Sequence, residues 1–344
     1  MKALVLKDYH HLVFEEVPTP KFSDDEVLVA VKACGICGSD VHGMDGSTGR
    51  RRPPLIMGHE AAGVIAEKGA NVAGFKVGDR VTFDSTIYCG HCRYCRAGKI
   101  NLCDNRRVLG VSCGDYKQDG AFAEYVAVPQ RILYPLPESI SFEHAALIEP
   151  FSIAFHAVRR LHPNLNDTVA VIGAGMIGIA LVQALRASGC GRIIVVDVAE
   201  EKLALAKTLG ATDSINSRDG KALDHLLALT NGVGVDAAFE AVGVAATVDL
   251  ALRGVCKGGS VALVGNVAPD ISFPLQTAVT RELTIYGSCA SSGEYPACLD
   301  LMSRGVIHPE PLLSATAPLS EGALWFKKLY QKEPGLLKVI LTVP

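Results

Sequence analysis

The stretch Thr168-Val-Ala-Val-Ile-Gly-Ala-Gly-Met-Ile-Gly178 decides the fold of this chain. Its first residues have the apolar pattern of a short buried strand, and a largely apolar helix is expected over 176–188. Each glycine has a physical reason: Gly173 permits a tight turn, Gly175 lets the backbone approach a pyrophosphate, and Gly178 lets the helix pack closely on the strand. Such glycine spacing is common in turns, but the preceding strand and the following helix make it specific for a dinucleotide site.

An acidic residue follows the glycines at the expected distance. A second predicted strand ends in Asp197, which follows Gly178 by 19 residues. A carboxylate there accepts hydrogen bonds from ribose hydroxyls and repels a 2′-phosphate, which predicts NAD rather than NADP. Met176 and Ile177 open the helix whose N-terminal N–H groups face the phosphates, so both belong to the predicted site. Lys202 either reaches the same ribose or lies on a solvated helix face.

The composition is typical of a globular protein with two domains. At 344 residues the chain is about twice as long as a usual single domain. A hydrophobic fraction of 49% excludes intrinsic disorder, and a net charge of −3 argues against nucleic acid or an acidic membrane as a partner. No secretory signal is recognised at the start, and eleven cysteines do not indicate a disulfide framework. We therefore expect a reducing, cytoplasmic compartment.

The pattern of elements changes near residue 150. Before it, short alternating apolar runs and long polar loops predict an irregular β-rich domain. After it, strands and helices alternate, which predicts a parallel sheet covered by helices on both faces and hence the α/β class. The weakly charged run 168–185 has roughly the length of a membrane span, but its glycines favour a strand, a turn and a helix instead.

Four cysteines form a dense group with the spacing Cys-x2-Cys-x2-Cys-x7-Cys: Cys89, Cys92, Cys95 and Cys103. Four thiolates on a polar, glycine-containing loop can surround one tetrahedral Zn²⁺. A shell of four sulfurs leaves no open coordination position, so this ion is predicted to be structural and to fix the long loop. An iron–sulfur cluster uses similar ligands and is the chemical alternative.

A second group of candidate ligands is dispersed along the chain. It consists of Cys37, the adjacent His59 and Glu60, and Glu149. One thiolate, one imidazole and one or two carboxylates, with water completing the shell, suit a catalytic zinc. Spacing alone does not decide this, because three separate segments must converge. Cys34 and Cys37 have the Cys-x-x-Cys spacing of a redox pair, but no thioredoxin-like pattern surrounds them, so packing is preferred for Cys34.

Together these motifs resemble the zinc-containing medium-chain dehydrogenase superfamily, in its polyol (sorbitol-type) branch. Besides the glycine motif and the cysteine loop, the resemblance rests on Gly35-Ile-Cys-Gly-Ser-Asp-Val-His42, Gly58-His-Glu60, Gly120-Ala-Phe-Ala-Glu-Tyr125, Ile148-Glu-Pro150 and Lys338-Val-Ile-Leu341. It implies a GroES-like, β-rich catalytic domain formed by residues 1–150 and 290–344, with a Rossmann NAD-binding domain, residues 151–289, inserted. It also implies a homotetramer or homodimer built largely through the nucleotide-binding domains.

The same resemblance implies a role for each candidate. It assigns the catalytic zinc to four residues: Cys37, His59, Glu60 and Glu149. Glu149 is either a ligand or a partner of the zinc-bound water, and Asp40 orients His59 through its second ring nitrogen. The zinc lowers the pKa of the substrate hydroxyl, Ser39 takes the alcohol proton, and His42 helps to pass it to solvent. The implied reaction transfers a hydride from a secondary alcohol of a polyol or sugar alcohol to NAD.

Two features of the sequence bear on the substrate. Where sorbitol-type enzymes commonly carry an Arg–aromatic pair, this chain has Ala290 and Ser291, so sorbitol itself is not the expected substrate. The run Arg50–Arg52 is either a solvated loop or a group that attracts an anionic substrate, such as a sugar-alcohol phosphate or an acid. Threonine 3-dehydrogenase and a butanediol-type dehydrogenase are the enzymatic alternatives. A cofactor-sensing regulator on the same scaffold is the non-enzymatic one.

Overall fold

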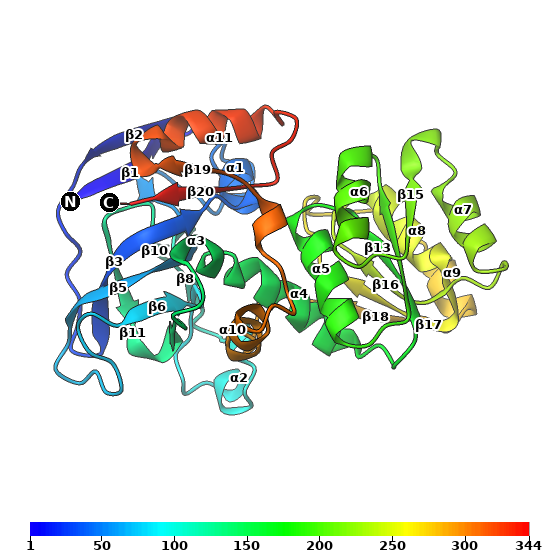
Figure 1. The fold of residues 1–344 in the computed structure, drawn as a ribbon, viewed down its shortest axis with the longest axis horizontal. Coiled ribbons are helices and arrows are strands. Elements are labelled where there is room, and N and C mark those ends of the chain that lie inside the picture. The colour runs from blue at the N-terminus through cyan, green and yellow to red at the C-terminus, as the bar shows by residue number, and fades with distance from the viewer. Residues whose placement is uncertain (344) are drawn as a thin grey trace. The chain divides into compact units, whose positions relative to one another are not determined.

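The computed structural model describes residues 1–343 and divides them into two units (Figure 1). The first contains Met1–Glu149, Tyr295–Ser303 and the residues from Pro309 onward, and the second contains Pro150–Glu294 and Arg304–His308. Each unit has its own sheet and its own apolar core. The domain limits drawn from the resemblance stay predictions. No helix within residues 1–343 combines the length and the apolar character needed to cross a bilayer.

The first unit is built on a seven-stranded sheet around β3. Its order is β12-β6-β5-β3-β20-β19, and β11 also pairs with β3. Every pair is antiparallel except β19 with β20. The strands are β3 (Glu26–Gly35), β5 (Glu60–Lys68), β6 (Arg80–Phe83), β11 (Tyr125–Pro129), β12 (Leu133–Pro135), β19 (Leu313–Pro318) and β20 (Lys338–Thr342). In β3, the alternating Val27, Val29 and Val31 are buried in the core of this unit.

Smaller sheets and short helices complete the first unit. The remaining strands are β1 (Lys2–Asp8), β2 (His11–Glu16), β4 (Leu55–Ile56), β7 (Thr86–Ile87), β8 (Arg107–Val108), β9 (Val111–Ser112) and β10 (Lys117–Gln118). The helices are α1 (Gly38–Gly43), α2 (Arg93–Arg96), α3 (Phe142–Ala145), α10 (Tyr295–Ser303) and α11 (Gly322–Tyr330). The pairing of β7 with β8 closes the base of the loop that carries the four grouped cysteines.

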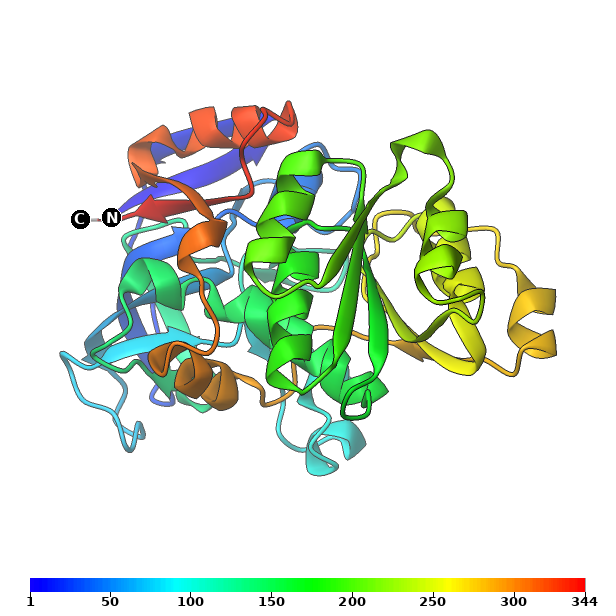
Figure 2. The same cartoon turned by 45° about the vertical axis from the view of Figure 1, so that its right-hand side comes forward.

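The second unit is a six-stranded parallel sheet in the order β15-β14-β13-β16-β17-β18. This is the strand order of a Rossmann sheet. The strands are β13 (Thr168–Ile172), β14 (Arg192–Asp197), β15 (Asp213–Asn216), β16 (Val235–Glu240), β17 (Val255–Leu263) and β18 (Thr284–Gly287). The helices are α4 (Ile148–Leu161), which begins in the first unit, α5 (Met176–Ala187), α6 (Glu200–Thr208), α7 (Ala222–Leu229), α8 (Ala245–Gly254) and α9 (Leu275–Thr280). In both views α5 and α6 cover one face of the sheet, and α7 and α8 cover the other (Figures 1 and 2). The predicted α/β class is confirmed.

Candidate metal centres and nucleotide-binding loop

The structure brings Cys37, His59 and Glu60 together in the first unit. Ligand atoms of these three side chains lie within 4.8 Å of one another. Cys37 directly precedes α1, while His59 and Glu60 stand where β5 begins. Because β3 and β5 are antiparallel with Gly35 opposite Glu60, their register places these two segments side by side. A sulfur, an imidazole nitrogen and a carboxylate oxygen form a donor set that fits Zn²⁺.

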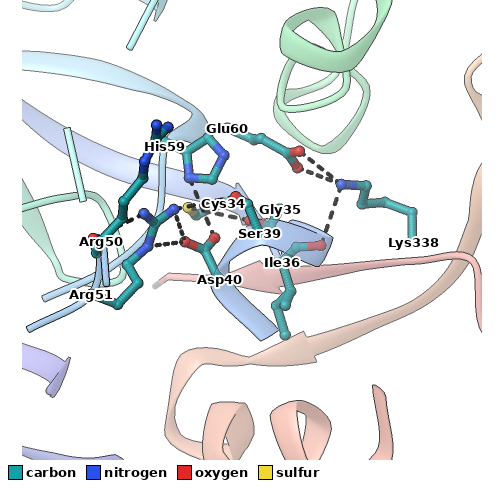
Figure 3. A network of polar contacts seen from close by, with 10 residues as sticks. All are labelled: Cys34, Gly35, Ile36, Ser39, Asp40, Arg50, Arg51, His59, Glu60 and Lys338. Carbon is teal, nitrogen blue, oxygen red and sulfur yellow. Dashed lines mark hydrogen bonds and ion pairs between the residues drawn. The ribbon is translucent and has the colours of Figure 1, made fainter. Parts of the chain in front are cut away.

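A buried carboxylate, Asp40 of α1, lies beside the ring of His59 (Figure 3). Its Oδ2 is 3.3 Å from Nδ1 of His59. Burial raises the pKa of Asp40, but the neighbouring His59 and Arg51 lower it overall to about 2. Burial lowers the pKa of His59, yet Asp40 and Cys37 raise it well above its usual value. With Nδ1 turned to Asp40, the other ring nitrogen is the one left for a metal.

Glu60 has a cationic partner that the sequence analysis did not identify. Nζ of Lys338 lies 2.9 and 2.6 Å from Oε1 and Oε2 of Glu60, and it also donates to the carbonyl of Ile36 at 3.2 Å (Figure 3). Lys338 and Glu60 are only 2% and 1% exposed, so the ion pair is buried. A lysine at the head of an otherwise apolar strand is the signal that could have revealed it, because a buried lysine is almost always paired.

Glu149 is not in the group of described residues whose ligand atoms gather within 4.8 Å of Cys37 and His59. It lies in the first turn of α4. Burial raises its pKa to about 8, with His59 acting in the opposite direction and Glu60 adding to the increase. These influences place its carboxyl in the electrostatic surroundings of the group. Its assignment as a ligand, or as a partner of zinc-bound water, stays a prediction.

Ser39 and His42 lie three residues apart on α1, and both are exposed. Side chains at this spacing are neighbours on a helix surface. Oγ of Ser39 accepts a hydrogen bond from Nη2 of Arg51 at 3.2 Å, and the backbone carbonyl of His42 accepts one from Oγ of Ser47 at 2.9 Å. The helix therefore presents a hydroxyl and an imidazole side by side, next to Cys37. Their role in proton transfer stays a prediction.

The arginine run is not a uniformly solvated loop. Arg50 and Arg52 are exposed, but Arg51 is 4% exposed and pairs with Asp40. Arg51 forms a parallel bridge with Ser112, and in extended backbone alternate side chains point to opposite sides. A solvated position is therefore wrong for Arg51. Its charge is neutralised by Asp40 rather than left for an anionic substrate.

The four grouped cysteines, Cys89, Cys92, Cys95 and Cys103, also converge, with their sulfurs within 4.8 Å of one another. They form no disulfide in the described chain, and the sulfurs of Cys89 and Cys95 are 4.0 Å apart. Backbone N–H groups point at these sulfurs: Cys89 donates to Cys103 at 3.2 Å, and Cys92 donates to Cys89 at 3.4 Å. Hydrogen bonds to its sulfur, first from the backbone of His91, lower the pKa of Cys89 to about 5, while burial and the neighbouring sulfurs raise the pKa of Cys95 to about 12. Four converging sulfurs with N–H groups directed at them fit a tetrahedral Zn²⁺.

In the second unit, the glycine motif forms the turn between β13 and α5. Gly173 has a φ of +96°, and a methyl group at Gly178 would overlap the carbonyl oxygen of Gly173, so both positions need glycine. Apart from the two residues next to it in the chain, no described atom lies within 4 Å of the place that a Cβ would take at Gly175. The backbone there is open to a ligand, as the approach of a pyrophosphate requires.

Asp197 lies at the end of β14, beside this turn. Its Oδ2 accepts from the N–H of Ala174 at 2.7 Å, and its Oδ1 accepts from the N–H of Ala199 at 2.9 Å. A carboxylate has about four acceptor positions, so capacity remains for ribose hydroxyls. The other predicted contacts are half-buried at the start of α5 and in the first turn of α6: Met176, Ile177 and Lys202. These cofactor contacts stay predictions.

Comparisons with known proteins match most of the chain. The family model described as alcohol dehydrogenase GroES-like domain matches residues 23–138, and the model described as zinc-binding dehydrogenase matches residues 177–304. The chain is 38% identical over 337 residues to sorbitol dehydrogenase of Bacillus subtilis (strain 168), which covers 95% of this chain and 94% of that protein.

Solved structures give the same result. The alcohol dehydrogenase from Thermus sp. ATN1 has a TM-score of 0.93 at 33% identity and covers 100% of both chains. A protein from Sinorhizobium meliloti 1021, described as a zinc-binding dehydrogenase and bound to NADP, has a TM-score of 0.90 at 32% identity and covers 99% of both chains. The predicted combination of a GroES-like and a Rossmann-type domain is confirmed.

Proposed function

Because the chain belongs to the zinc-binding dehydrogenases of the alcohol dehydrogenase type, we propose that Cys37, His59 and Glu60 hold the zinc with which it oxidises a polyol. The observation that carries this proposal is the convergence of a thiol, an imidazole and a carboxylate within 4.8 Å. The thiol of Cys37 and the imidazole of His59 come from positions 22 apart in the sequence. The reaction transfers a hydride from a secondary alcohol of a polyol or sugar alcohol to NAD.

Family membership confirms what the resemblance implied about the class of protein. The chain is an oxidoreductase of the zinc-dependent medium-chain type, acts on alcohol substrates and uses a nicotinamide cofactor. The non-enzymatic alternative, a cofactor-sensing regulator on the same scaffold, is therefore not proposed.

The residues around the proposed zinc site have distinct tasks. A bound zinc supplies a Lewis acid that lowers the pKa of a coordinated hydroxyl. Asp40 keeps the ring of His59 in one orientation, and Lys338 holds the carboxylate of Glu60. The exposed hydroxyl of Ser39 accepts the substrate proton, and His42, exposed on the same helix, passes it to solvent.

The loop of four cysteines is proposed to hold a second, structural zinc. Its donors are thiols only, and four sulfurs complete a tetrahedral shell. β7 and β8 pair at the base of the loop, and the loop between them has little regular structure. The ion therefore supplies a cross-link that the loop otherwise lacks.

The cofactor is proposed to be NAD rather than NADP. The open backbone at Gly175 and the N-terminus of α5 receive the pyrophosphate, and Asp197 receives the ribose hydroxyls. A 2′-phosphate in that place would meet the negative charge of Asp197, which opposes NADP. A rate with NADP equal to that with NAD would contradict this assignment.

A homodimer or homotetramer in the cytoplasm is also proposed. Among the described strands β18 pairs only with β17, so one of its edges is open to a second copy. Large exposed apolar side chains lie nearby in the chain, at Val267, Leu275 and Val279. A reducing compartment suits the grouped thiols. Analytical ultracentrifugation measures the assembly, and a monomer at micromolar concentration would contradict it.

Metal analysis of Cys37→Ser beside the unmodified protein tests the central proposal. We expect the variant to lose one zinc per chain and all NAD reduction, while its circular dichroism spectrum stays unchanged. Undiminished NAD reduction would contradict the proposal. A substrate screen over polyols, their phosphates, L-threonine and 2,3-butanediol identifies the alcohol, and activity confined to threonine or butanediol would replace the polyol by one of these alternatives.

A further inference from the structure

The middle member of the arginine run has contacts that the proposed function does not yet explain. Nε and Nη2 of Arg51 lie 3.0 and 2.9 Å from Oδ1 of Asp40, and Nη2 also donates to Oγ of Ser39 at 3.2 Å (Figure 3). Arg51 is 4% exposed. One buried guanidinium therefore contacts both the carboxylate beside His59 and the hydroxyl that is proposed to accept the substrate proton.

We propose that Arg51 is a positioning residue, which fixes the carboxylate of Asp40 toward His59 and the hydroxyl of Ser39 toward the substrate. This inference rests on the proposed function, because it assumes that His59 binds zinc and that Ser39 accepts a proton.

The contact with Asp40 decides which oxygen faces His59. Arg51 engages Oδ1, and the remaining Oδ2 is the oxygen 3.3 Å from Nδ1 of His59. Asp40 is fully buried, so its negative charge needs a compensating cation within the protein. A histidine that binds a metal is neutral, which leaves Arg51 as the fixed positive charge. Without Arg51, only the contact with His59 orients the carboxylate of Asp40.

The contact with Ser39 gives its hydroxyl a direction. A guanidinium only donates hydrogen bonds, so one lone pair of the Ser39 oxygen is occupied by Arg51. One lone pair then remains for the incoming substrate proton, and the hydroxyl hydrogen is free to leave toward His42. The proton that Ser39 gains is balanced by the one that it gives up. Without the hydrogen bond from Arg51, the hydroxyl of Ser39 rotates among several orientations, and most of them do not allow the proton transfer.

The fold holds Arg51 from two sides. Its backbone bridges Ser112, whose N–H donates to the carbonyl of Arg50 and whose carbonyl accepts from the N–H of Arg52, both at 3.1 Å. On the other side stands Gly43 of α1, where a methyl group would overlap Cγ of Arg51. The absence of a side chain at Gly43 makes the space that the arginine stem occupies. The substitution Gly43→Ala therefore displaces Arg51 while keeping every charge.

Three variants test the proposal: Arg51→Gln, Arg51→Lys and Gly43→Ala. For Arg51→Gln we expect kcat to fall by about 10–100-fold, the usual effect of disturbing the residue that orients a metal ligand, here Asp40, with a smaller change in KM. Zinc release to a chelator, measured without substrate, should have two phases, one for each zinc. Arg51→Gln should accelerate the phase that Cys37→Ser lacks. Arg51→Lys keeps the charge beside Asp40 and should restore slow zinc release without restoring kcat. Gly43→Ala should fall between Arg51→Gln and the unmodified protein in both measurements.

Arg192→Gln is the control, because Arg192 makes a two-point pair with Asp213 in the second unit, at 2.8 and 3.0 Å, where the side chains are 36% and 26% exposed. It should lower the melting temperature but leave kcat and zinc release unchanged. The proposal is overturned if Arg51→Gln keeps the unmodified kcat and zinc release, or if Arg192→Gln reproduces its defects. Cys37→Ser distinguishes this result from a failure of the proposed function. If Cys37→Ser still releases zinc in both phases, Cys37 does not bind the zinc and the proposed function is wrong. If Arg51→Gln does not fold, Arg51→Lys and Gly43→Ala, which keep the charge, test the role of Arg51 instead.

Discussion

Lys338 is a buried cation whose three donors are all used. Two of its contacts go to the oxygens of Glu60 and one to the carbonyl of Ile36, so the ammonium group loses none of the hydrogen bonds that water would provide. Such a pair is stable because both partners are present, and the removal of one leaves an uncompensated charge. Lys338 therefore fixes the carboxylate that the proposed zinc site requires.

The substitution Lys338→Met should destabilise the protein strongly. It leaves Glu60 buried without its cation, and we expect the free energy of unfolding to fall by about 3–5 kcal/mol. Urea denaturation of the protein, followed by tryptophan fluorescence, measures the change. The signal reports on the first unit, because Trp325 lies on α11 in that unit. Lys117→Met is the control, since its pair with Asp119 is exposed and 3.7 Å long. Equal stabilities of the two variants would show that the buried pair contributes nothing special.

The residue types of Cys37, His59 and Glu60 suggest metal binding, but their spacing did not decide that they converge; that expectation came from the resemblance to a known family. The partners of Lys338 and Arg51 could not be assigned in this way, although a lysine at the head of an apolar strand indicates that it has one. Whether a lysine or an arginine is buried depends on which carboxylate the fold places next to it. For Lys338 that carboxylate is 278 positions away and is brought near by the pairing of β20 with β3.

At the scale of elements, the loop between β7 and β8 depends on its sulfurs. The short α2 is its main regular element, and its N-terminal cap is the side chain of Cys92, which accepts from the N–H of Cys95. Few apolar side chains of this loop are buried, so packing alone does not fix its path.

The substitution Cys92→Ser should remove one zinc per chain and loosen this loop. A hydroxyl is a poor replacement for a thiolate in a four-sulfur shell, and the loop loses its cross-link. We expect faster proteolytic cleavage within residues 89–103, while the zinc assigned to Cys37 is retained. Cys113→Ser is the control, because Cys113 lies outside the group and donates to Asp115. An unchanged zinc content in Cys92→Ser would contradict the structural role.

Elements with a strong local pattern agree with the sequence. The short strand expected before Gly173 is found as β13, and the helix expected over 176–188 is found as α5, which ends one residue earlier. By contrast, the nine-residue strand β5 is longer than the short alternating apolar runs expected before residue 150. The start of this strand is rich in alanine, and a methyl group at Gly63 would overlap the carbonyl oxygen of Ala30 in β3. Because two strands approach closely here, small residues are required. Such residues lack the alternation of large apolar and polar side chains by which a strand is predicted from the sequence.

At the scale of the whole molecule, stability depends on carboxylates that stay charged in the folded state. In the second unit, the hydrogen bond from Arg192 lowers the pKa of Asp213. Burial raises the pKa of Glu294, but the hydrogen bond with His156 and other partners lower it overall. A lowered folded-state pKa contributes stability above the unfolded value, which is about 4, and this contribution is lost as the pH falls through the folded value. The molecule should therefore lose stability on acidification below about pH 5.

The substitution Glu294→Gln tests this pH dependence. Glu294 is 5% exposed, and its Oε1 lies 3.0 Å from Nδ1 of His156 and 3.2 Å from Nη1 of Arg159. The amide keeps an acceptor but loses the charge, so we expect a free energy of unfolding lower by about 1 kcal/mol at pH 7. This difference should shrink toward pH 3, because the carboxyl of the unmodified protein then takes up a proton as well. Urea unfolding at pH 7, 5 and 3 measures this difference.

Glu310→Gln is the control, since Glu310 is exposed and 3.7 Å from His144. A difference that stays constant with pH, or one that Glu310→Gln matches, would mean that the charge of Glu294 does not stabilise the fold.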